Sequence, residues 1–291
     1  MPDEQRDGAA MTQRTDSFTH DGLRFDVRDS GPLDGTPVVL LHGFPQNSRS
    51  WDGVAAHLHD AGFRTLVPTQ RGYSPDARPR RIRDYRASAL VGDVLALLDA
   101  AELPNAHVAG HDWGAVVAWH LAAGHPDRVR SLTAVSVPHP AAMARSWTNP
   151  RQALSSWYML AFQIPRLPEL ALSRPALARK VLVRTGQAPR EAERDAELLS
   201  DRDVVRGAVN WYRAMMLSSP RALTAKVRVP TTMVWSDGDA AIDATGPERT
   251  ARYVDAPYRF VTLRGLSHWI PDEGPGVLAS LIAETVTSAG R

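Results

Sequence analysis

The chain has 291 residues, of which 43% are hydrophobic and 23% are charged, as expected for a globular protein with a sizeable buried core. It contains no cysteine, which excludes disulfides, thiolate metal sites and cysteine nucleophiles. The net charge is only +2, so we expect no nucleic-acid partner. No apolar run approaches the ~18 residues typical of a transmembrane helix, and we expect no membrane association.

Residues 1–16 lack the apolar stretch of a secretory signal peptide. They are also polar and rich in small side chains. We therefore expect a disordered N-terminal lead over residues 1–16 and a cytoplasmic protein.

The first predicted strands, residues 18–20 and 23–27, flank an Asp-Gly pair, which is a strong hairpin signal. We expect both to be antiparallel edge strands. Two short apolar runs follow at residues 38–41 and 65–67. Each run is typical of a strand that is buried on both faces of a parallel sheet.

A basic cluster precedes the next predicted helix. It consists of Arg78, Arg80, Arg81, Arg83 and Arg86. Such a cluster could bind phosphate groups, but acidic residues and prolines interrupt it. We interpret it as a solvated loop leading into a helix over residues 90–98, where leucines and valines recur at helical spacing.

The most informative segment is Gly-His-Asp-Trp-Gly at residues 110–114. Residues 106–110 form a predicted buried strand and residues 115–121 a predicted helix, so the pentapeptide should be a tight turn that presents Asp112. Glycines suit this turn because bulkier residues would clash in it. A carboxylate is ionised at neutral pH without a helping base. Asp112 is therefore a candidate nucleophile for a saturated carbon, where its attack forms a stable ester.

A strand is predicted at residues 132–137, and the pattern then changes. Residues 138–222 show no convincing strand and carry helical segments rich in aromatic residues and methionine. Strand signals resume at residues 231–235 and 260–263, followed by a last helix over residues 276–287.

This order predicts a mostly parallel sheet flanked by helices, with an inserted helical cap, and the turn at Asp112 resembles the nucleophile turn of the α/β-hydrolase fold. We expect residues 17–137 to form the first part of the core. Residues 138–222 should form the cap, and residues 223–291 the second part of the core.

Three more motifs follow predicted strands, at the edge of the sheet where α/β proteins place ligands. In His42-Gly43-Phe44-Pro45 the glycine permits a close backbone approach, so that the N–H of Phe44 could join that of Trp113 in an oxyanion hole. The loop after residue 235 offers two acids, Asp237 and Asp239. The last motif, Gly-Leu-Ser-His-Trp at residues 265–269, follows the last predicted strand and supplies His268. It completes the chain order of nucleophile, acid and histidine.

These motifs together resemble the epoxide hydrolases of the α/β-hydrolase superfamily, and the resemblance spans residues 17–289. The cap segments Trp-Tyr-Met-Leu-Ala-Phe-Gln at 157–163 and Asn-Trp-Tyr-Arg at 210–213 are similar to the two that each supply a tyrosine to the epoxide oxygen in this family. The resemblance implies that Tyr158 and Tyr212 have this role. It also favours Asp239 as the acid, although Ser236 replaces an expected glycine and keeps Asp237 open as the alternative.

The expected function is hydrolysis of a hydrophobic epoxide to a vicinal diol, with water as co-substrate and without metal or cofactor. Asp112 would form an alkyl ester, while Tyr158 and Tyr212 protonate the oxygen. His268, oriented by Asp239, would then activate water. Two alternatives remain open. A haloalkane dehalogenase shares Asp112 and His268 but needs a second halide donor, and a non-catalytic ligand-binding protein could have the same fold.

Overall fold

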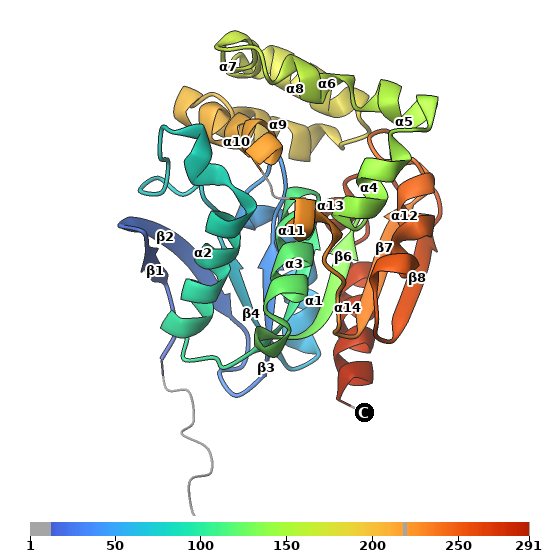
Figure 1. Ribbon diagram of the computed structural model, residues 1–291. Helices are drawn as coiled ribbons and strands as arrows, with labels where there is room; N and C mark the ends of the chain where they lie inside the picture. Colours follow the sequence, from blue (N-terminus) through green and yellow to red (C-terminus); the bar gives the residue numbers. More distant parts are fainter. Residues whose placement is uncertain (1–12, 218–219, 291) are drawn as a thin grey trace, which may run out of the picture.

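A computed structural model describes residues 13–217 and 220–290 (Figure 1). Eight strands within these residues form one sheet in the order β1-β2-β4-β3-β5-β6-β7-β8. The strands are β1 (Ser17–His20), β2 (Leu23–Ser30), β3 (Thr36–Leu41), β4 (Phe63–Pro68), β5 (Ala106–His111), β6 (Val129–Val135), β7 (Thr231–Ser236) and β8 (Tyr258–Leu263). From β4 to β8 every neighbouring pair is parallel. The predicted fold class is confirmed.

The first two strands form the predicted hairpin around Asp21 and Gly22, both of which have positive φ angles. Of these two strands only β1 lies at the edge of the sheet, so the prediction that both are edge strands is wrong for β2. The reason is the length of β2. Its first half pairs with β1, and its second half, Val27 to Ser30, pairs antiparallel with β4.

Helices cover both faces of the sheet (Figure 1). The helices before β6 are α1 (Asp52–Asp60), α2 (Ala87–Ala100) and α3 (Trp113–Gly124), and those after β7 are α12 (Thr245–Arg249), α13 (Ile270–Glu273) and α14 (Pro275–Ala289). Along β3, Val38 and Leu40 belong to the core cluster of α1 and α14. Val39 and Leu41 belong to the cluster of α2 and α3. This alternation explains why the strand is apolar at every position.

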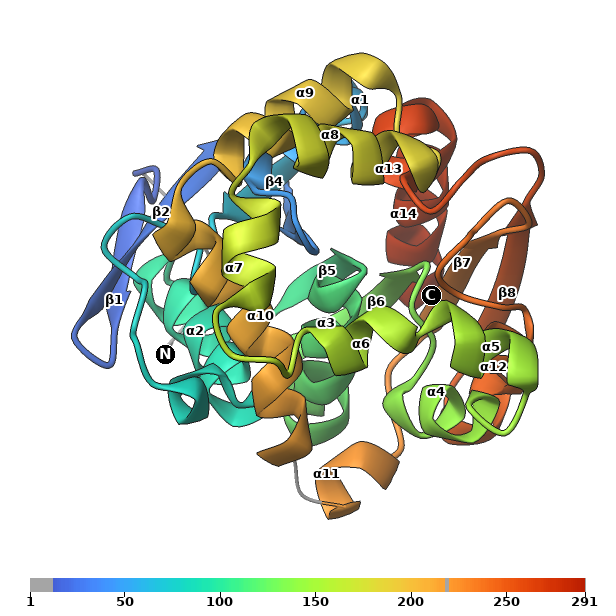
Figure 2. The same cartoon turned by 90° about the horizontal axis from the view of Figure 1, so that it is seen from above.

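Helices alone occupy the described residues between β6 and β7. They are α4 (Pro140–Ser146), α5 (Pro150–Ser155), α6 (Trp157–Ala161), α7 (Leu167–Leu172), α8 (Pro175–Arg184), α9 (Pro189–Leu198), α10 (Arg202–Ala214) and α11 (Pro220–Thr224). The helices α5 to α10 lie over the carboxyl ends of the parallel strands (Figures 1 and 2). These helices therefore cover one end of the sheet.

The helix α10 lies directly on the core. A Cβ atom added to Gly207 would lie 2.6 Å from the Cα of Gly72, so the two backbones touch. Beside this contact the indole N–H of Trp211 donates to the carbonyl oxygen of Arg71 at 2.8 Å. The helix is therefore fixed by both packing and a buried hydrogen bond.

The N-terminal and basic segments also have defined contacts. Residues 1–12 of the predicted lead lie outside the described residues, whereas the backbone N–H of Thr15 donates to Asp29 at 2.9 Å. In the basic cluster Arg78 pairs with Asp201 at 2.6 Å. The other four arginines are exposed, as expected for a solvated loop. No helix in the described part of the chain is long and apolar enough to cross a membrane.

We expect Asp93→Ala to lower the free energy of unfolding by about 3–5 kcal/mol, because it removes the buried carboxylate that accepts two hydrogen bonds from a buried guanidinium. Asp93 on α2 accepts from the buried Arg71 at 2.6 and 2.8 Å. Urea unfolding of both proteins measures the difference. Asp52→Ala, which removes an exposed partner of Arg28, is the control, with an expected loss under about 1 kcal/mol. Equal losses in the two variants would contradict the prediction.

Candidate active site

The turn between β5 and α3 presents Asp112 at the carboxyl edge of the sheet. Asp112 has φ 53° and ψ −120°, a conformation that most residues avoid. A Cβ atom on Gly110 would lie 2.3 Å from the carbonyl oxygen of Gly114, and one on Gly114 would lie 2.0 Å from that of Leu41. The two glycines are therefore required by close backbone contacts, as the sequence predicted. Asp112 itself lies at the N-terminus of α3, where the helix dipole favours an anion.

Two backbone N–H groups hold the carboxylate of Asp112. The N–H of Phe44 donates to Oδ1 at 2.7 Å, and the N–H of Trp113 is a second donor. Burial acts to raise the pKa of Asp112, but the hydrogen bond and charge of His268, the neighbouring His111 and the N–H of Trp113 outweigh it and hold the pKa below its usual value. The carboxylate is therefore ionised in the resting site.

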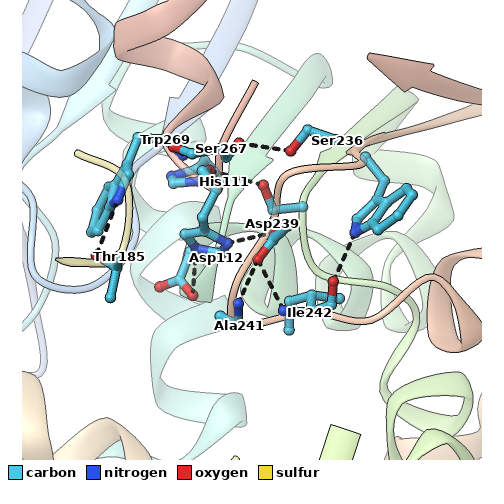
Figure 3. Close-up of polar contacts among 12 residues, drawn as sticks. His111, Asp112, Thr185, Ser236, Asp239, Ala241, Ile242, Ser267 and Trp269 are labelled. Carbon is cyan, nitrogen blue, oxygen red and sulfur yellow. Dashed lines mark hydrogen bonds and ion pairs between the residues drawn. The ribbon is translucent and has the colours of Figure 1, made fainter. Parts of the chain in front are cut away.

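The acid loop after β7 places Asp239 against His268. Oδ2 of Asp239 lies 2.7 Å from Nδ1 of His268, while Oδ1 accepts the backbone N–H groups of Ala241 and Ile242 (Figure 3). Asp237 is exposed and instead accepts the N–H of Gly265 at 2.8 Å. The structure thus brings Asp239, the acid that the resemblance favoured over Asp237, into contact with His268.

His268 lies between two carboxylates. Its Nε2 is 3.5 Å from Oδ2 of Asp112, on the side opposite Asp239. Burial acts to lower the pKa of His268, but the charges of Asp239 and Asp112 and the hydrogen bonds to both raise it to about 10. The imidazole is therefore protonated at neutral pH while Asp112 is charged.

We expect Asp239→Asn to slow the catalytic cycle by weakening the base, because the imidazole loses the charge that orients it. Asp237→Asn should stay within about twofold of the unmodified protein, since its side chain contacts only the loop at Gly265. Steady-state turnover of an epoxide compares the two matched variants. A large loss in Asp237→Asn alone would reverse the choice of acid.

The two tyrosines predicted from the cap segments lie beside Asp112. Tyr158 comes from α6 and Tyr212 from α10, and their rings meet edge to face with centroids 5.8 Å apart. The ring of Tyr212 also contacts Trp113 and Phe44. Burial raises the pKa of both phenols, and the negative charge of Asp112 adds to this effect. Both phenols are therefore protonated and able to donate.

Asp112, Tyr158 and Tyr212 line one cavity of about 320 Å³. The rest of its wall is mostly apolar and comes from α2, α3, α4, α6, α10 and α11 and from the loops that precede α2 and follow β6 and β7. A buried nucleophile thus faces two proton donors across a space suited to a hydrophobic molecule.

Several supporting contacts were not predicted from the sequence. The side chain of His111, within the elbow motif, lies 2.9 Å from the carbonyl oxygen of His268 through Nε2, and burial lowers its pKa to about 4. Ser236 donates to the carbonyl oxygen of Ser267 at 2.6 Å. Ser236 stands where the resemblance implied a glycine, and its hydroxyl joins the acid loop to the histidine loop (Figure 3).

A polar cluster joins the cap to the core near the Phe44 loop. Arg194 of α9 contacts Asp195 at 2.8 Å and Asp272 of α13 at 3.1 Å. Gln46 donates to Asp272 at 2.7 Å. These residues are far apart in the chain and match no motif, so the sequence carried no signal for them.

Comparison with known proteins identifies the family. The α/β hydrolase fold family model matches residues 36–275. The AB hydrolase superfamily protein YfhM of Bacillus subtilis is 32% identical over 279 residues, which cover 90% of this chain and 94% of the relative. Epoxide hydrolase A of Mycobacterium tuberculosis is 30% identical over 308 residues, which cover 91% of this chain and 95% of that protein. The chain belongs to the epoxide hydrolases of the α/β-hydrolase superfamily.

Solved structures agree with this assignment. Epoxide hydrolase A from Mycobacterium thermoresistibile has a TM-score of 0.77 at 28% identity, covering 93% of this chain and 97% of that one. An epoxide hydrolase from metagenomes of hot environments has a TM-score of 0.81 at 26% identity, covering 95% and 99%. The resemblance to epoxide hydrolases that the motifs indicated is therefore confirmed.

Proposed function

We propose that this chain hydrolyses a hydrophobic epoxide to a vicinal diol through an ester on Asp112. The observation that carries the proposal is the placement of two protonated phenols and an ionised carboxylate around one apolar cavity. Residues 138–222 would act as the cap that supplies the phenols. Ring opening needs such donors because the leaving oxygen would otherwise depart as an alkoxide.

In the first step Oδ2 of Asp112 attacks a ring carbon and the carbon–oxygen bond of the epoxide breaks. Oδ1 stays with the N–H of Phe44 and becomes the carbonyl oxygen of the ester. Tyr158 or Tyr212 gives its proton to the opened oxygen. Once Asp112 is a neutral ester, His268 loses one of the two charges that raise its pKa. The proton that His268 then releases restores the phenol.

In the second step neutral His268 takes a proton from water, and the hydroxide attacks the carbonyl carbon of the ester. Negative charge develops on Oδ1, where the N–H groups of Phe44 and Trp113 stabilise it. The tetrahedral intermediate collapses by breaking its bond to the diol oxygen, which takes the proton of the newly added hydroxyl. This restores the charged Asp112 and the protonated His268.

A substrate panel tests the proposal. The purified protein is incubated separately with styrene oxide, 1-bromobutane and a nitrophenyl ester, and diol, bromide and nitrophenol are measured. We expect diol from styrene oxide and little product from the others. Bromide release alone would make the protein a haloalkane dehalogenase, and no product from any substrate would contradict an enzymatic role.

We expect Tyr158→Phe and Tyr212→Phe each to slow ring opening by roughly 10²-fold, the usual loss for a positioned acid. The double variant should nearly stop the reaction. Hydrolysis of the ester should change little, because the phenols face the leaving oxygen and not the acyl carbon. Rapid-quench kinetics with styrene oxide separates the two steps. A single variant with an unchanged ring-opening rate would show that its tyrosine only packs in the cap.

A further inference from the structure

The cavity extends along α3 away from the nucleophile. Its lining residues from this helix recur at helical spacing and form one face, namely Asp112 at the N-cap followed by Trp113, Val116, Val117 and His120. Eight residues separate Asp112 from His120, which corresponds to about 12 Å along a helix axis. The cavity therefore reaches about two helical turns beyond the reacting carboxylate.

The walls of the cavity that face α3 are also formed by residues at several successive positions along two helices. The helix α4 and the residue after it contribute Pro140, Met143, Ala144 and Trp147. The end of α10 and the turn after it contribute Trp211, Tyr212, Met215 and Met216. Trp147 is 40% and Met216 74% exposed, so the cavity is open to solvent on the side of these two residues. An extended apolar molecule fits this shape better than a compact one.

His120 is a polar exception in this wall. Its imidazole makes no hydrogen bond with any residue that the structure describes. Two other polar groups of the wall have partners, since the hydroxyl of Tyr85 donates to the carbonyl oxygen of Pro79 at 2.8 Å and the indole of Trp211 to that of Arg71 at 2.8 Å. A polar side chain that is half-buried without a partner costs free energy unless a ligand or water satisfies it.

Burial lowers the pKa of His120 to about 4, so the imidazole is neutral at physiological pH. A neutral imidazole offers one N–H donor and one nitrogen acceptor. It has no charge to compensate an ionised carboxylate in an apolar wall. The matching ligand group is therefore neutral and hydrogen-bonding.

We propose that His120 recognises a hydroxyl or carbonyl group at the far end of an elongated epoxide whose ring lies at Asp112. This rests on the proposed function and narrows its substrate class to chain-like epoxides with a neutral polar group about 10 Å from the ring, the span given by two turns of α3. His120 is a specificity residue and takes no part in either chemical step.

Two matched pairs of epoxides test the proposal. The long pair is 1,2-epoxydecane and 9,10-epoxydecan-1-ol, and the short pair is 1,2-epoxyhexane and 5,6-epoxyhexan-1-ol. The readout is the ratio of kcat/KM for the alcohol to that for the plain epoxide. The ratio is compared between the unmodified protein and each His120 variant. This comparison cancels the intrinsic difference in solvation between the alcohol and the plain epoxide.

For the long pair, His120→Phe should lower the ratio by about fivefold, the usual worth of one neutral hydrogen bond. The ratio for the short pair should not change, because its hydroxyl cannot reach His120. His120→Gln keeps a donor and an acceptor and should retain part of the preference. It also serves as the test variant if circular dichroism shows that His120→Phe does not fold.

An unchanged ratio for the long pair in His120→Phe, or in His120→Gln if only that variant folds, would overturn the inference while leaving the proposed function intact. Equal changes in the long and short pairs would also overturn it, because they would show a general effect on the cavity. A preference for 9,10-epoxydecanoate over the alcohol would contradict recognition of a neutral group. Failure of the unmodified protein to open any of the four epoxides would instead contradict the proposed function.

Discussion

Asp112→Ala is expected to lower epoxide turnover by about 10⁴-fold or more, as when other covalent nucleophiles are removed. Asp112 is the one carboxylate among the described residues that line the cavity with Tyr158 and Tyr212, and it accepts the N–H of Phe44. Steady-state diol formation measures the loss. Thermal unfolding of the variant provides the control that the strained turn still forms.

Isotope labelling tests the same role in the unmodified protein. In a single turnover in ¹⁸O-labelled water the label should enter Asp112, and the first diol should carry the oxygen already present in the carboxylate. This follows because water attacks the carbonyl carbon of the ester and the bond to the diol oxygen breaks. A first diol that carries the solvent label would show direct attack of water on the epoxide and refute the ester.

His268→Ala is expected to open the epoxide and then stop. Removing His268 takes away a hydrogen bond and a charge that lower the pKa of Asp112, but the N–H groups of Phe44 and Trp113 still donate to its carboxylate, so ring opening should proceed at a pH high enough to ionise it. The variant lacks the imidazole whose Nε2 lies 3.5 Å from Asp112 and which would deprotonate water. Intact-protein mass spectrometry after substrate addition should show a gain equal to the mass of the epoxide, located on the peptide that contains Asp112. Normal turnover in this variant would eliminate the proposed role of His268.

The pH dependence of ester hydrolysis follows from the two carboxylates around His268. In the free enzyme the pKa of His268 is raised to about 10 by Asp239 and Asp112, and esterification of Asp112 removes one of these charges. The pKa of His268 in the ester should therefore be lower than in the free enzyme. Since neutral His268 is the base, hydrolysis in single-turnover experiments should accelerate as pH rises and level off below pH 10.

The sequence predicted those features of the fold that depend on residues close together in the chain. The glycines around Asp112 indicated a tight turn because a side chain there meets the backbone at once, and the apolar run of β3 indicated a strand that is buried on both faces. The tyrosine positions followed from the family resemblance, since an isolated cap tyrosine gives no signal that distinguishes catalysis from packing.

What the sequence missed depends on contacts between distant segments. Asp237 and Asp239 lie two residues apart in the same loop, so the spacing alone could not choose between them; the family resemblance favoured Asp239, and the fold shows that it contacts His268. The place of β2 inside the sheet depends on pairing with β4, more than thirty residues later. The contact of Arg194 with Asp272 joins two helices that share no motif.

The contact between Gly207 and Gly72 has a consequence for how this catalytic pocket can diversify. It fixes α10, and with it Tyr212, against a part of the core where no additional atom fits. Tyr158 is carried by α6, a five-residue helix without a fully buried side chain. Tyr212 is thus held by a close backbone contact, and Tyr158 by a segment without a fully buried side chain. Substitutions that reshape the pocket for bulkier substrates should therefore be tolerated better on α6 than on α10.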